Sequence, residues 1–211
     1  MSKGEETRAA ILDEAVAEAS RFGLEALTIG QLAQRVGLSK SGLFAHFGSK
    51  EDLQLQVLES AVARFVERVV APGLRAARGV PRVRSLFEHW LAWEQDAALL
   101  PGGCVFITLA NELDDRPGPL RDRLVGYQRD WIEALATAAR IAVEEGHFRA
   151  GLDTAQFAHD FYSVFLAYHH FNRLLREPRA EERARRAFDH LVAAAAGPDV
   201  PDPEPPAHPA P

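Results

Sequence analysis

The sequence contains a single cysteine, which excludes a disulfide framework and a structural zinc site built on cysteine ligands. No apolar stretch approaches the roughly 18 residues that a membrane-spanning helix needs, so no membrane partner is expected. The opening run, Met-Ser-Lys-Gly-Glu-Glu-Thr-Arg, lacks the apolar segment of a secretory signal peptide. We therefore expect a cytoplasmic protein.

Motifs of catalysis and metal binding are also missing. The sequence has no glycine-rich phosphate loop, no G-x-S-x-G, no H-E-x-x-H, and no H-x-E combined with C-x-x-C. His169 and His170 are adjacent, and neighbouring helical residues point about 100° apart, so they cannot chelate one ion together. We expect no enzymatic activity, no metal and no cofactor.

What the chain does have is apolar content and helical periodicity. Of its 211 residues 47% are hydrophobic, and the net charge is −6, which is enough apolar material for a sizeable core. Apolar residues recur every three to four positions, which predicts an all-α fold of about nine helices. The predicted helices span residues 2–22, 29–36, 39–46, 49–71, 81–99, 104–113, 119–145, 154–175 and 179–196.

The pattern divides the chain into an N-terminal three-helix unit over residues 1–48 and a helical unit over 49–197. Residues 198–211 hold seven of the thirteen prolines, so we expect a disordered, proline-rich tail there. The first unit has the features of a helix-turn-helix, because a tight turn containing Gly37 joins its second and third helices. Thr28, Ser39 and Ser49 stand where helix N-caps are expected.

The third helix presents short polar residues at its start, Ser39 to Gly42, while Leu43 and Phe47 point back to the core. Short polar residues in that position can reach base edges in DNA. Residues 27–50 contain three cations and no acid, so this window carries +3 and the rest of the chain −9. The local charge therefore favours contact with an anionic partner.

Residues 27–53, Leu-Thr-Ile-Gly-Gln-Leu-Ala-Gln-Arg-Val-Gly-Leu-Ser-Lys-Ser-Gly-Leu-Phe-Ala-His-Phe-Gly-Ser-Lys-Glu-Asp-Leu, resemble the DNA-binding signature of TetR-type transcriptional regulators. The match covers about residues 4–55. The resemblance implies phosphate contacts from Thr28, Lys40, His46 and Lys50, with Ser39, Ser41 and Gly42 near base edges. Phe44 departs from the family pattern, which has a tyrosine there whose hydroxyl can donate to a phosphate.

The resemblance also implies an effector-binding and dimerisation domain in the second part of the chain. Aromatic and amphipathic residues of the central helices are candidates for its cavity, although packing in an ordinary core explains most of them equally well. Asn111, with Glu112, is a polar outlier on an apolar helix that could orient a ligand. Cys104 has no cation close in sequence, which favours a buried structural thiol over a redox sensor. The candidate pocket residues are Trp90, Trp93, Cys104, Phe106, Asn111, Tyr127, Trp131, Phe165 and His169.

Spacings of 4, 3, 4, 3 and 4 residues place apolar side chains along one narrow seam between residues 157 and 175. Such a seam is typical of coiled-coil packing and looks too apolar to face water in a monomer. We therefore predict that this helix and the last one pair with their copies in a four-helix bundle. The predicted interface residues are Phe157, Phe161, Val164, Tyr168, Phe171, Phe188 and Leu191.

Together these features predict a sequence-specific transcriptional regulator. The expected protein is a repressor that binds a palindromic double-stranded DNA operator as a homodimer. A small apolar or amphipathic effector, of unknown identity, would release it by tilting the fourth helix. The alternative is a helical dimeric interaction protein, or a small-molecule-binding protein, without operator binding.

Overall fold

The computed structural model describes residues 3–196, and every regular element in that range is helical. The predicted proline-rich tail lies outside these residues. The elements are α1 (Lys3–Phe22), α2 (Ile29–Arg35), α3 (Lys40–Phe47), α4 (Lys50–Phe65), the π-helix η1 (Val66–Val70), α5 (Ala71–Arg75), α6 (Val80–Gln95), α7 (Val105–Leu113), α8 (Pro119–Glu144), α9 (Thr154–His169), the π-helix η2 (His170–Leu174) and α10 (Ala180–Ala196). The elements α4, η1 and α5 join without interruption into one rod, and α9 and η2 join into another. Counted in this way, the described range holds nine continuous helical rods, as predicted.

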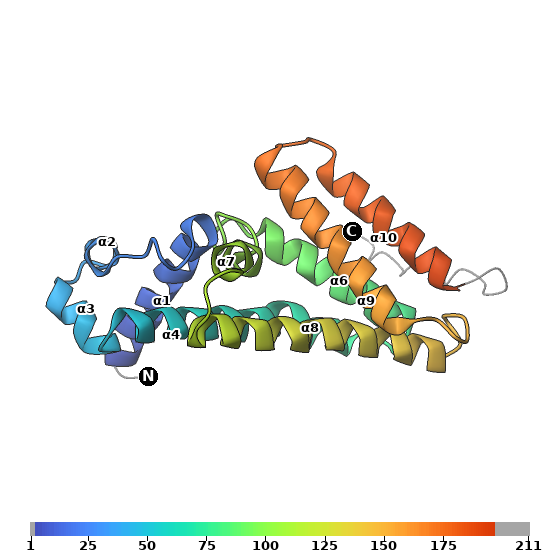
Figure 1. Ribbon diagram of the computed structural model, residues 1–211, viewed down its shortest axis with the longest axis horizontal. Coiled ribbons are helices and arrows are strands. Elements are labelled where there is room, and N and C mark those ends of the chain that lie inside the picture. Colours follow the sequence, from blue (N-terminus) through green and yellow to red (C-terminus); the bar gives the residue numbers. More distant parts are fainter. Residues whose placement is uncertain (1–2, 197–211) are drawn as a thin grey trace, which may run out of the picture.

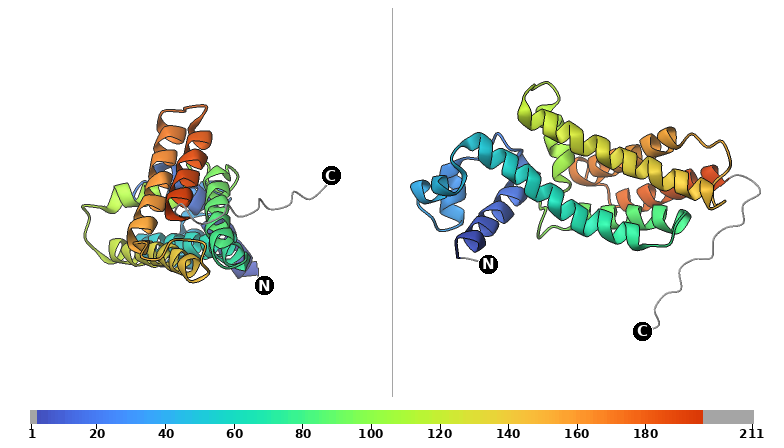
Figure 2. Two further views of the ribbon diagram at one scale, coloured as in Figure 1. Left: turned by 90° about the vertical axis from the view of Figure 1, so that its right-hand side faces the viewer. Right: turned by 90° about the horizontal axis from the view of Figure 1, so that it is seen from below.

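The molecule is elongated, with α1, α2 and α3 at one end and α9 and α10 toward the other (Figure 1). The rod formed by α4, η1 and α5 runs along the molecule next to α8, and both ends of this arrangement can be followed from below (Figure 2). Helix α7 packs against α1 and is seen nearly end-on between α1 and α6 in Figure 1. It therefore connects the N-terminal unit with the central helices.

Local sequence explains the N-terminal unit. The hydroxyl oxygens of Thr28, Ser39 and Ser49 accept hydrogen bonds from backbone N–H groups three residues ahead, at 3.3, 3.0 and 3.0 Å. These are the predicted N-caps of α2, α3 and α4. Gly37 has a φ of +70°, which an L side chain disfavours, and the turn closes with the Leu38 N–H donating to the carbonyl of Ala33 at 2.8 Å.

The prediction that the fourth helix stops before Pro72 is wrong. The rod continues through η1 into α5 and ends at Arg75. Proline has no N–H to donate. In the wider π-turn just before it, the Ala71 N–H donates to the carbonyl of Val66, five residues back, in place of the carbonyl four residues back. Pro72 then occupies the first turn of α5, where a missing N–H disrupts little.

The next predicted helix end is wrong as well. Helix α6, which the sequence predicts to end near residue 99, stops at Gln95, because Asp96 leaves the helical conformation with a ψ of 80°. Its carboxylate accepts the N–H of Leu99 at 3.0 Å. Phe22, the last residue of α1, is 61% exposed.

The core of the larger unit is a cluster of aromatic rings from α6, α9 and α10. Trp90 stacks on Phe165 with ring centroids 3.7 Å apart, and Phe87 stacks on Phe188 at 3.9 Å. Phe161 packs edge-on against both Phe87 and Phe188. The apolar seam of α9 is therefore covered by helices of its own chain.

This packing corrects the predicted dimer interface. Phe157, Phe161, Tyr168 and Phe188 are all buried inside a single chain, so they are not a free face for a second copy. Heptad-like spacing demands an apolar partner but does not say which one, and α6 and α10 supply it here. Val164 and Leu191 are half-buried at the edge of this core, and only Phe171, 39% exposed, remains open to solvent.

Candidate functional site: the recognition helix and a central cavity

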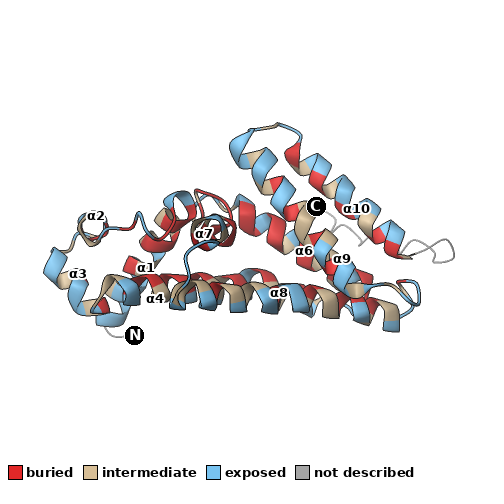
Figure 3. Cartoon of the chain, viewed as in Figure 1, coloured by how far each residue is buried: buried red, intermediate tan, exposed pale blue. Residues whose placement is uncertain are grey.

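Helix α3 exposes the side chains that the sequence assigned to DNA. Ser39, Lys40, Ser41 and Phe44 are exposed, and Phe44 retains 48% of its accessible surface. In Figure 3 much of α3 has the colour of exposed residues. Leu43 and Phe47 are buried, as predicted. Thr28 is exposed at the start of α2, and Gly42 and His46 are half-exposed on α3. The helix-turn-helix therefore presents one polar face around a single exposed aromatic ring.

The two lysines predicted to bind phosphate have different surroundings. The Nζ of Lys50 lies 3.1 Å from Oε1 of Glu25 and 3.0 Å from its backbone carbonyl oxygen. This ion pair lowers the pKa of Glu25, chiefly through the hydrogen bond from Lys50. Lys40 makes no hydrogen bond or ion pair with any residue between 3 and 196, and its side chain lies over Gly30. Its ammonium group is available to an anion.

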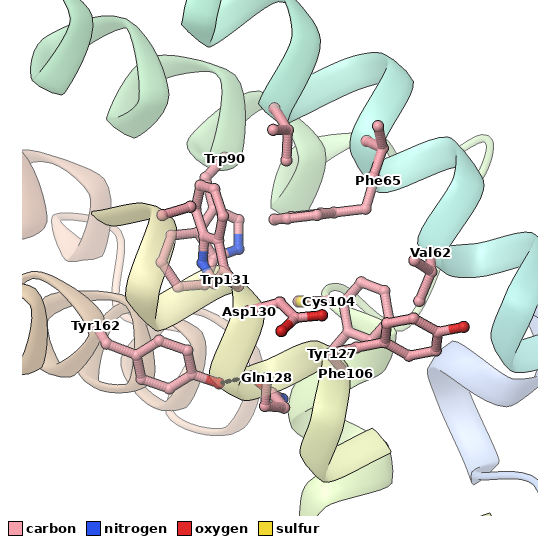
Figure 4. A pocket seen from close by; sticks show the side chains of 13 residues that line it. Val62, Phe65, Trp90, Cys104, Phe106, Tyr127, Gln128, Asp130, Trp131 and Tyr162 are labelled. Atoms are coloured by element: carbon pink, nitrogen blue, oxygen red, sulfur yellow. Dashed lines mark hydrogen bonds between the residues drawn. The ribbon is translucent and has the colours of Figure 1, made fainter. Parts of the chain in front are cut away.

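A cavity of about 290 Å³ lies between the α4–η1 rod and α8, closed by residues of α6, α7 and α9 (Figure 4). Its walls are almost entirely apolar and aromatic. The lining residues are Val62, Phe65, Val66, Val70, Trp90, Cys104, Phe106, Tyr127, Gln128, Asp130, Trp131, Ala134 and Tyr162.

Part of the predicted pocket lines this cavity: Trp90, Cys104, Phe106, Tyr127 and Trp131. Among the others, Trp93 is buried behind the wall, where it packs on Phe65 and Phe106. Phe165 stacks on Trp90 within the core. These two residues support the wall and do not line the cavity.

The two polar candidates are also placed elsewhere. The His169 Nδ1 lies 2.9 Å from Oε1 of Glu94, a carboxylate with no exposed side-chain surface. This imidazole is therefore paired with a buried carboxylate of its own chain. Asn111 is exposed on α7. Its neighbour Glu112 accepts the backbone N–H groups of Leu24 and Glu25 at 2.7 and 2.6 Å. Both residues of this pair therefore face away from the cavity, toward solvent and α1.

The sequence analysis missed a whole wall of the cavity. Val62, Phe65, Val66 and Val70 come from one face of the α4–η1 rod. On α8, Ala134 was also missed, although it continues the face of the predicted Tyr127 and Trp131 at a spacing of three to four residues, a signal that the sequence does contain. An apolar face looks the same whether it lines a cavity or fills a core, so the pattern alone could not identify the wall.

The electrostatics of the cavity are uneven. Asp130 is the only charged residue among those that line it, and no Lys, Arg or His does so. Burial raises the pKa of the Cys104 thiol to about 12, so this group is neutral at ordinary pH. Burial also raises the pKa of Tyr162 to about 12, and its hydroxyl donates to the Gln128 side-chain oxygen at 2.8 Å.

Helix α7 connects the cavity with the helix-turn-helix. Cys104 lines the cavity and stands at the N-cap of α7, where Glu94 accepts its N–H at 2.6 Å. Farther along, the Thr108 hydroxyl donates to the carbonyl of Ser20 at 3.0 Å, and the other end carries Glu112 with its two bonds to the α1–α2 turn. A displacement of α7 by a ligand would therefore also move the α1–α2 turn, which leads into the helix-turn-helix.

The described residues form neither a metal site nor a membrane span. Between residues 3 and 196, no three His, Cys, Asp or Glu side chains come together in a group that could hold a metal ion. None of the helices in this part of the chain combines the length and apolar character needed to cross a membrane. The recognition surface and the central cavity remain the two candidate sites.

Comparisons with known proteins agree with this architecture. Residues 11–57 match the family of bacterial regulatory proteins of the tetR type, and residues 79–188 match the tetracyclin repressor-like C-terminal domain. A TetR transcriptional regulator from Chloroflexus aurantiacus is 25% identical, with a TM-score of 0.80 over 92% of this chain and 96% of that one. No curated protein matches the chain.

Two further solved structures share the fold at lower identity. Reduced NemR from E. coli is 19% identical, with a TM-score of 0.77 over 92% of this chain and 100% of its own. AibR, solved with isovaleryl coenzyme A and operator DNA, is 21% identical, with a TM-score of 0.66 over 90% of this chain and 98% of its own. Because the C-terminal domain match alone spans more than half of the sequence, and the helix-turn-helix matches separately, this chain belongs to the TetR family of transcriptional regulators.

Proposed function

We propose that this regulator is a repressor that binds a palindromic operator as a homodimer and is released by a small, largely apolar effector bound in the central cavity. The observation that carries the proposal is the position of the cavity. It is lined by the α4–η1 rod, which follows α3 directly along the chain, and by α7, which holds the α1–α2 turn. AibR, which shares the fold, was solved in complex with isovaleryl coenzyme A and operator DNA.

On DNA, we propose that phosphate contacts position α3 and base contacts select the sequence. Lys40, with a free ammonium group, is assigned to phosphate, together with Thr28 and His46. Ser39, Ser41 and Gly42 are assigned to base edges. Phe44 cannot donate to phosphate, and its exposed ring instead suits apolar contact with a thymine methyl group.

For the dimer, we propose an interface on the exposed side of α9 and η2, in place of the buried seam. Large apolar side chains remain exposed along these two elements and just after them: Leu166, Phe171, Leu174 and Leu175. A second copy related by a twofold axis would cover the same patch on both chains, and it would set two α3 helices at a fixed distance. That distance is what an effector can change.

The test is the selection of bound DNA from a random pool with the full-length protein. We expect an inverted repeat whose half-sites are centred about one helical turn of ~34–36 Å apart, or somewhat more. In salt titrations on the selected site, Lys40→Ala should lower the slope by about two per dimer and weaken all sequences alike. Ser41→Ala should keep the slope and relax preference at one symmetric base pair.

These results distinguish the proposal from a small-molecule-binding or interaction protein that does not recognise an operator. Such a protein would enrich no sequence, and its residual DNA binding would respond to salt but not to Ser41→Ala. Selection of a single half-site without symmetry would contradict the dimeric arrangement alone.

A further inference from the structure

The cavity has hydrogen-bond donors without acceptors. Four buried side-chain nitrogens have no hydrogen-bond partner among residues 3–196: the indole Nε1 atoms of Trp90, Trp93 and Trp131 and the amide nitrogen of Gln128. Trp90 is 2% exposed and Trp131 is 7% exposed, so bulk water does not satisfy them. A buried polar group without a partner costs free energy, and native proteins leave few such groups.

Three of these donors, those of Trp90, Trp131 and Gln128, belong to residues that line the cavity, and they lie on two elements that face each other across the core, α6 and α8. Figure 4 shows the two indole rings together at one end of the cavity, with the hydrogen-bonded pair of Tyr162 and Gln128 nearby. The Gln128 oxygen already accepts the Tyr162 hydroxyl, so the amide offers only its nitrogen to a ligand. What the cavity lacks at this end is an acceptor.

The charge of the lining residues narrows the chemical class of the ligand further. Asp130 is exposed and lines the cavity, and no cationic residue does. A carboxylate or phosphate on the ligand would be repelled by this negative charge, and no cation among the lining residues would compensate for it. An amine or hydroxyl near Asp130 would instead donate to its carboxylate.

The walls favour a flat ring system. Phe65 packs edge-on to Trp131 with centroids 5.0 Å apart, and Trp90 packs edge-on to Trp131 at 5.3 Å. Aromatic faces and edges on several sides of one space suit the offset and edge-to-face packing of a planar aromatic molecule. The volume of about 290 Å³ is at the small end for ligand sites, so a few fused rings would fill it.

From these observations we infer that the effector is a small, planar aromatic compound without negative charge, whose carbonyl or ether oxygen accepts hydrogen bonds from Trp90, Trp131 and Gln128. A donor group elsewhere on its ring system would face Asp130. The inference rests on the proposed function of the cavity as the effector site, and it adds the chemical class of the ligand.

The experiment uses four tricyclic probes of similar size and isothermal titration calorimetry on the full-length protein. Acridone has the oxygen acceptor, 2-aminoacridone has the acceptor and an amine, 2-aminoanthracene has the amine alone, and acridone-4-carboxylate adds a negative charge. We expect 2-aminoacridone to bind most tightly and acridone next. Acridone-4-carboxylate should bind at least about tenfold more weakly than acridone, because of its charge.

Three substitutions separate the hydrogen bond from the ring. Trp131→Phe and Trp90→Phe each keep an aromatic ring but remove an indole N–H, and each should weaken acridone about fivefold while leaving 2-aminoanthracene unchanged. Trp93→Phe is the matched control, because Trp93 is buried in the same aromatic cluster but does not line the cavity. It should leave the affinities of both probes unchanged.

The inference is overturned if acridone-4-carboxylate binds most tightly, if the two indole substitutions weaken both probes equally, or if none of the four probes binds to protein that still binds DNA. Operator release is measured separately by fluorescence anisotropy. If the probes bind in the expected order but do not release the operator, the ligand class stands and the proposed effector response fails.

Discussion

The pairing of Lys50 with Glu25 changes what a single charge does at the edge of the recognition surface. In the free protein the Lys50 ammonium is held by a carboxylate of the α1–α2 turn. Contact with a phosphate would have to compete with this carboxylate, whose pKa is lowered chiefly by the hydrogen bond from Lys50. The sequence shows an acid-free window from residue 27 to residue 50, yet the acid that matters lies just outside it.

We therefore predict that Glu25→Gln strengthens binding to all DNA severalfold and makes the salt dependence steeper, because it removes a negative charge and releases Lys50. Affinity is measured against salt on operator and scrambled DNA. Asp52→Asn is the control, since this exposed carboxylate bonds to Ser49 and not to a lysine. If both variants change binding equally, Lys50 has no specific role at the phosphate backbone.

Cys104 illustrates how burial alone sets the chemistry of a residue. Its thiol is fully buried, and desolvation, followed by the nearby Glu94 carboxylate, raises its pKa from 9.0 to about 12. At pH 8 the thiolate is scarce, so this cysteine is a poor nucleophile although it lines a cavity. The expectation of a structural rather than a redox-active thiol agrees with this environment.

The raised pKa has a consequence for stability. Above pH 9 the unfolded thiol loses its proton while the folded one keeps it, so the native state binds more protons and the free energy of unfolding falls with rising pH. At pH 10 this group alone should cost about 1.4 kcal/mol relative to pH 8. Urea unfolding of the wild type and of Cys104→Ala between pH 8 and 10 measures it. Identical pH slopes for the two proteins would contradict the assignment.

At the scale of elements, the turn between α2 and α3 depends on backbone conformation rather than on packing. A Cβ at Gly37 would meet no atom within 4 Å, but φ there is +70°. Gly126 in α8 also has open space around a Cβ, and it lies in a regular helix. The two glycines therefore differ in φ while the space around them is alike.

We predict opposite effects for the same substitution at these two positions. Gly37→Ala should destabilise the protein by about 1–2 kcal/mol, the cost of a left-handed conformation for an L side chain. Gly126→Ala should stabilise it by about 0.5–1 kcal/mol, because alanine loses less entropy in a helix. Denaturant midpoints at constant slope decide the signs. Two destabilised variants would mean that space around Gly126 is tighter than it looks.

For the whole molecule, α7 is the element through which the cavity can influence DNA binding. Glu112 anchors it to the α1–α2 turn. At its other end, Glu94 in the core accepts the backbone N–H of the N-cap residue, Cys104. Two backbone N–H groups that converge on one carboxylate form strong, charge-assisted bonds. The larger unit and the helix-turn-helix are thus held together by more than the α4 rod.

We predict that Glu112→Ala keeps effector affinity but reduces the coupling between effector and operator by about 1 kcal/mol, or roughly fivefold. Coupling is the ratio of operator affinities with and without bound ligand. Asn111→Ala, at an exposed neighbouring position on the same helix, should leave the ratio unchanged. An unchanged ratio in Glu112→Ala would assign the coupling to the α4 rod alone.

The proposed dimer surface gives a second prediction at this scale. Leu166→Glu combined with Leu174→Glu should give folded monomers in sedimentation, because charges placed on the exposed face of α9 and η2 prevent its burial by a second copy. Leu74→Glu is the control, at a position of α5 that is 45% exposed. Phe161→Glu should unfold the protein instead, since Phe161 is a core residue. A double variant that stays dimeric would place the interface elsewhere.

The sequence by itself determined the helix-turn-helix and the all-helical class. The reason is that caps, the Gly37 turn and the polar start of α3 act over a few residues, and Thr28, Ser39 and Ser49 cap the predicted helices. Five residues that it proposed for a pocket line the cavity, four of them aromatic side chains of central helices that gather in one interior. These features are local, or follow from composition.

Only the tertiary structure decided what each apolar face contacts. Periodicity identifies a face but not its partner, so Phe161 and Phe188 were assigned to a second copy and lie in the core of one chain. For the same reason the Val62–Val70 wall of the cavity could not be told from an ordinary packed face. Whether an apolar side chain meets a neighbour, a cavity or a second molecule depends on how distant helices pack, and that information is not contained in spacing along one helix.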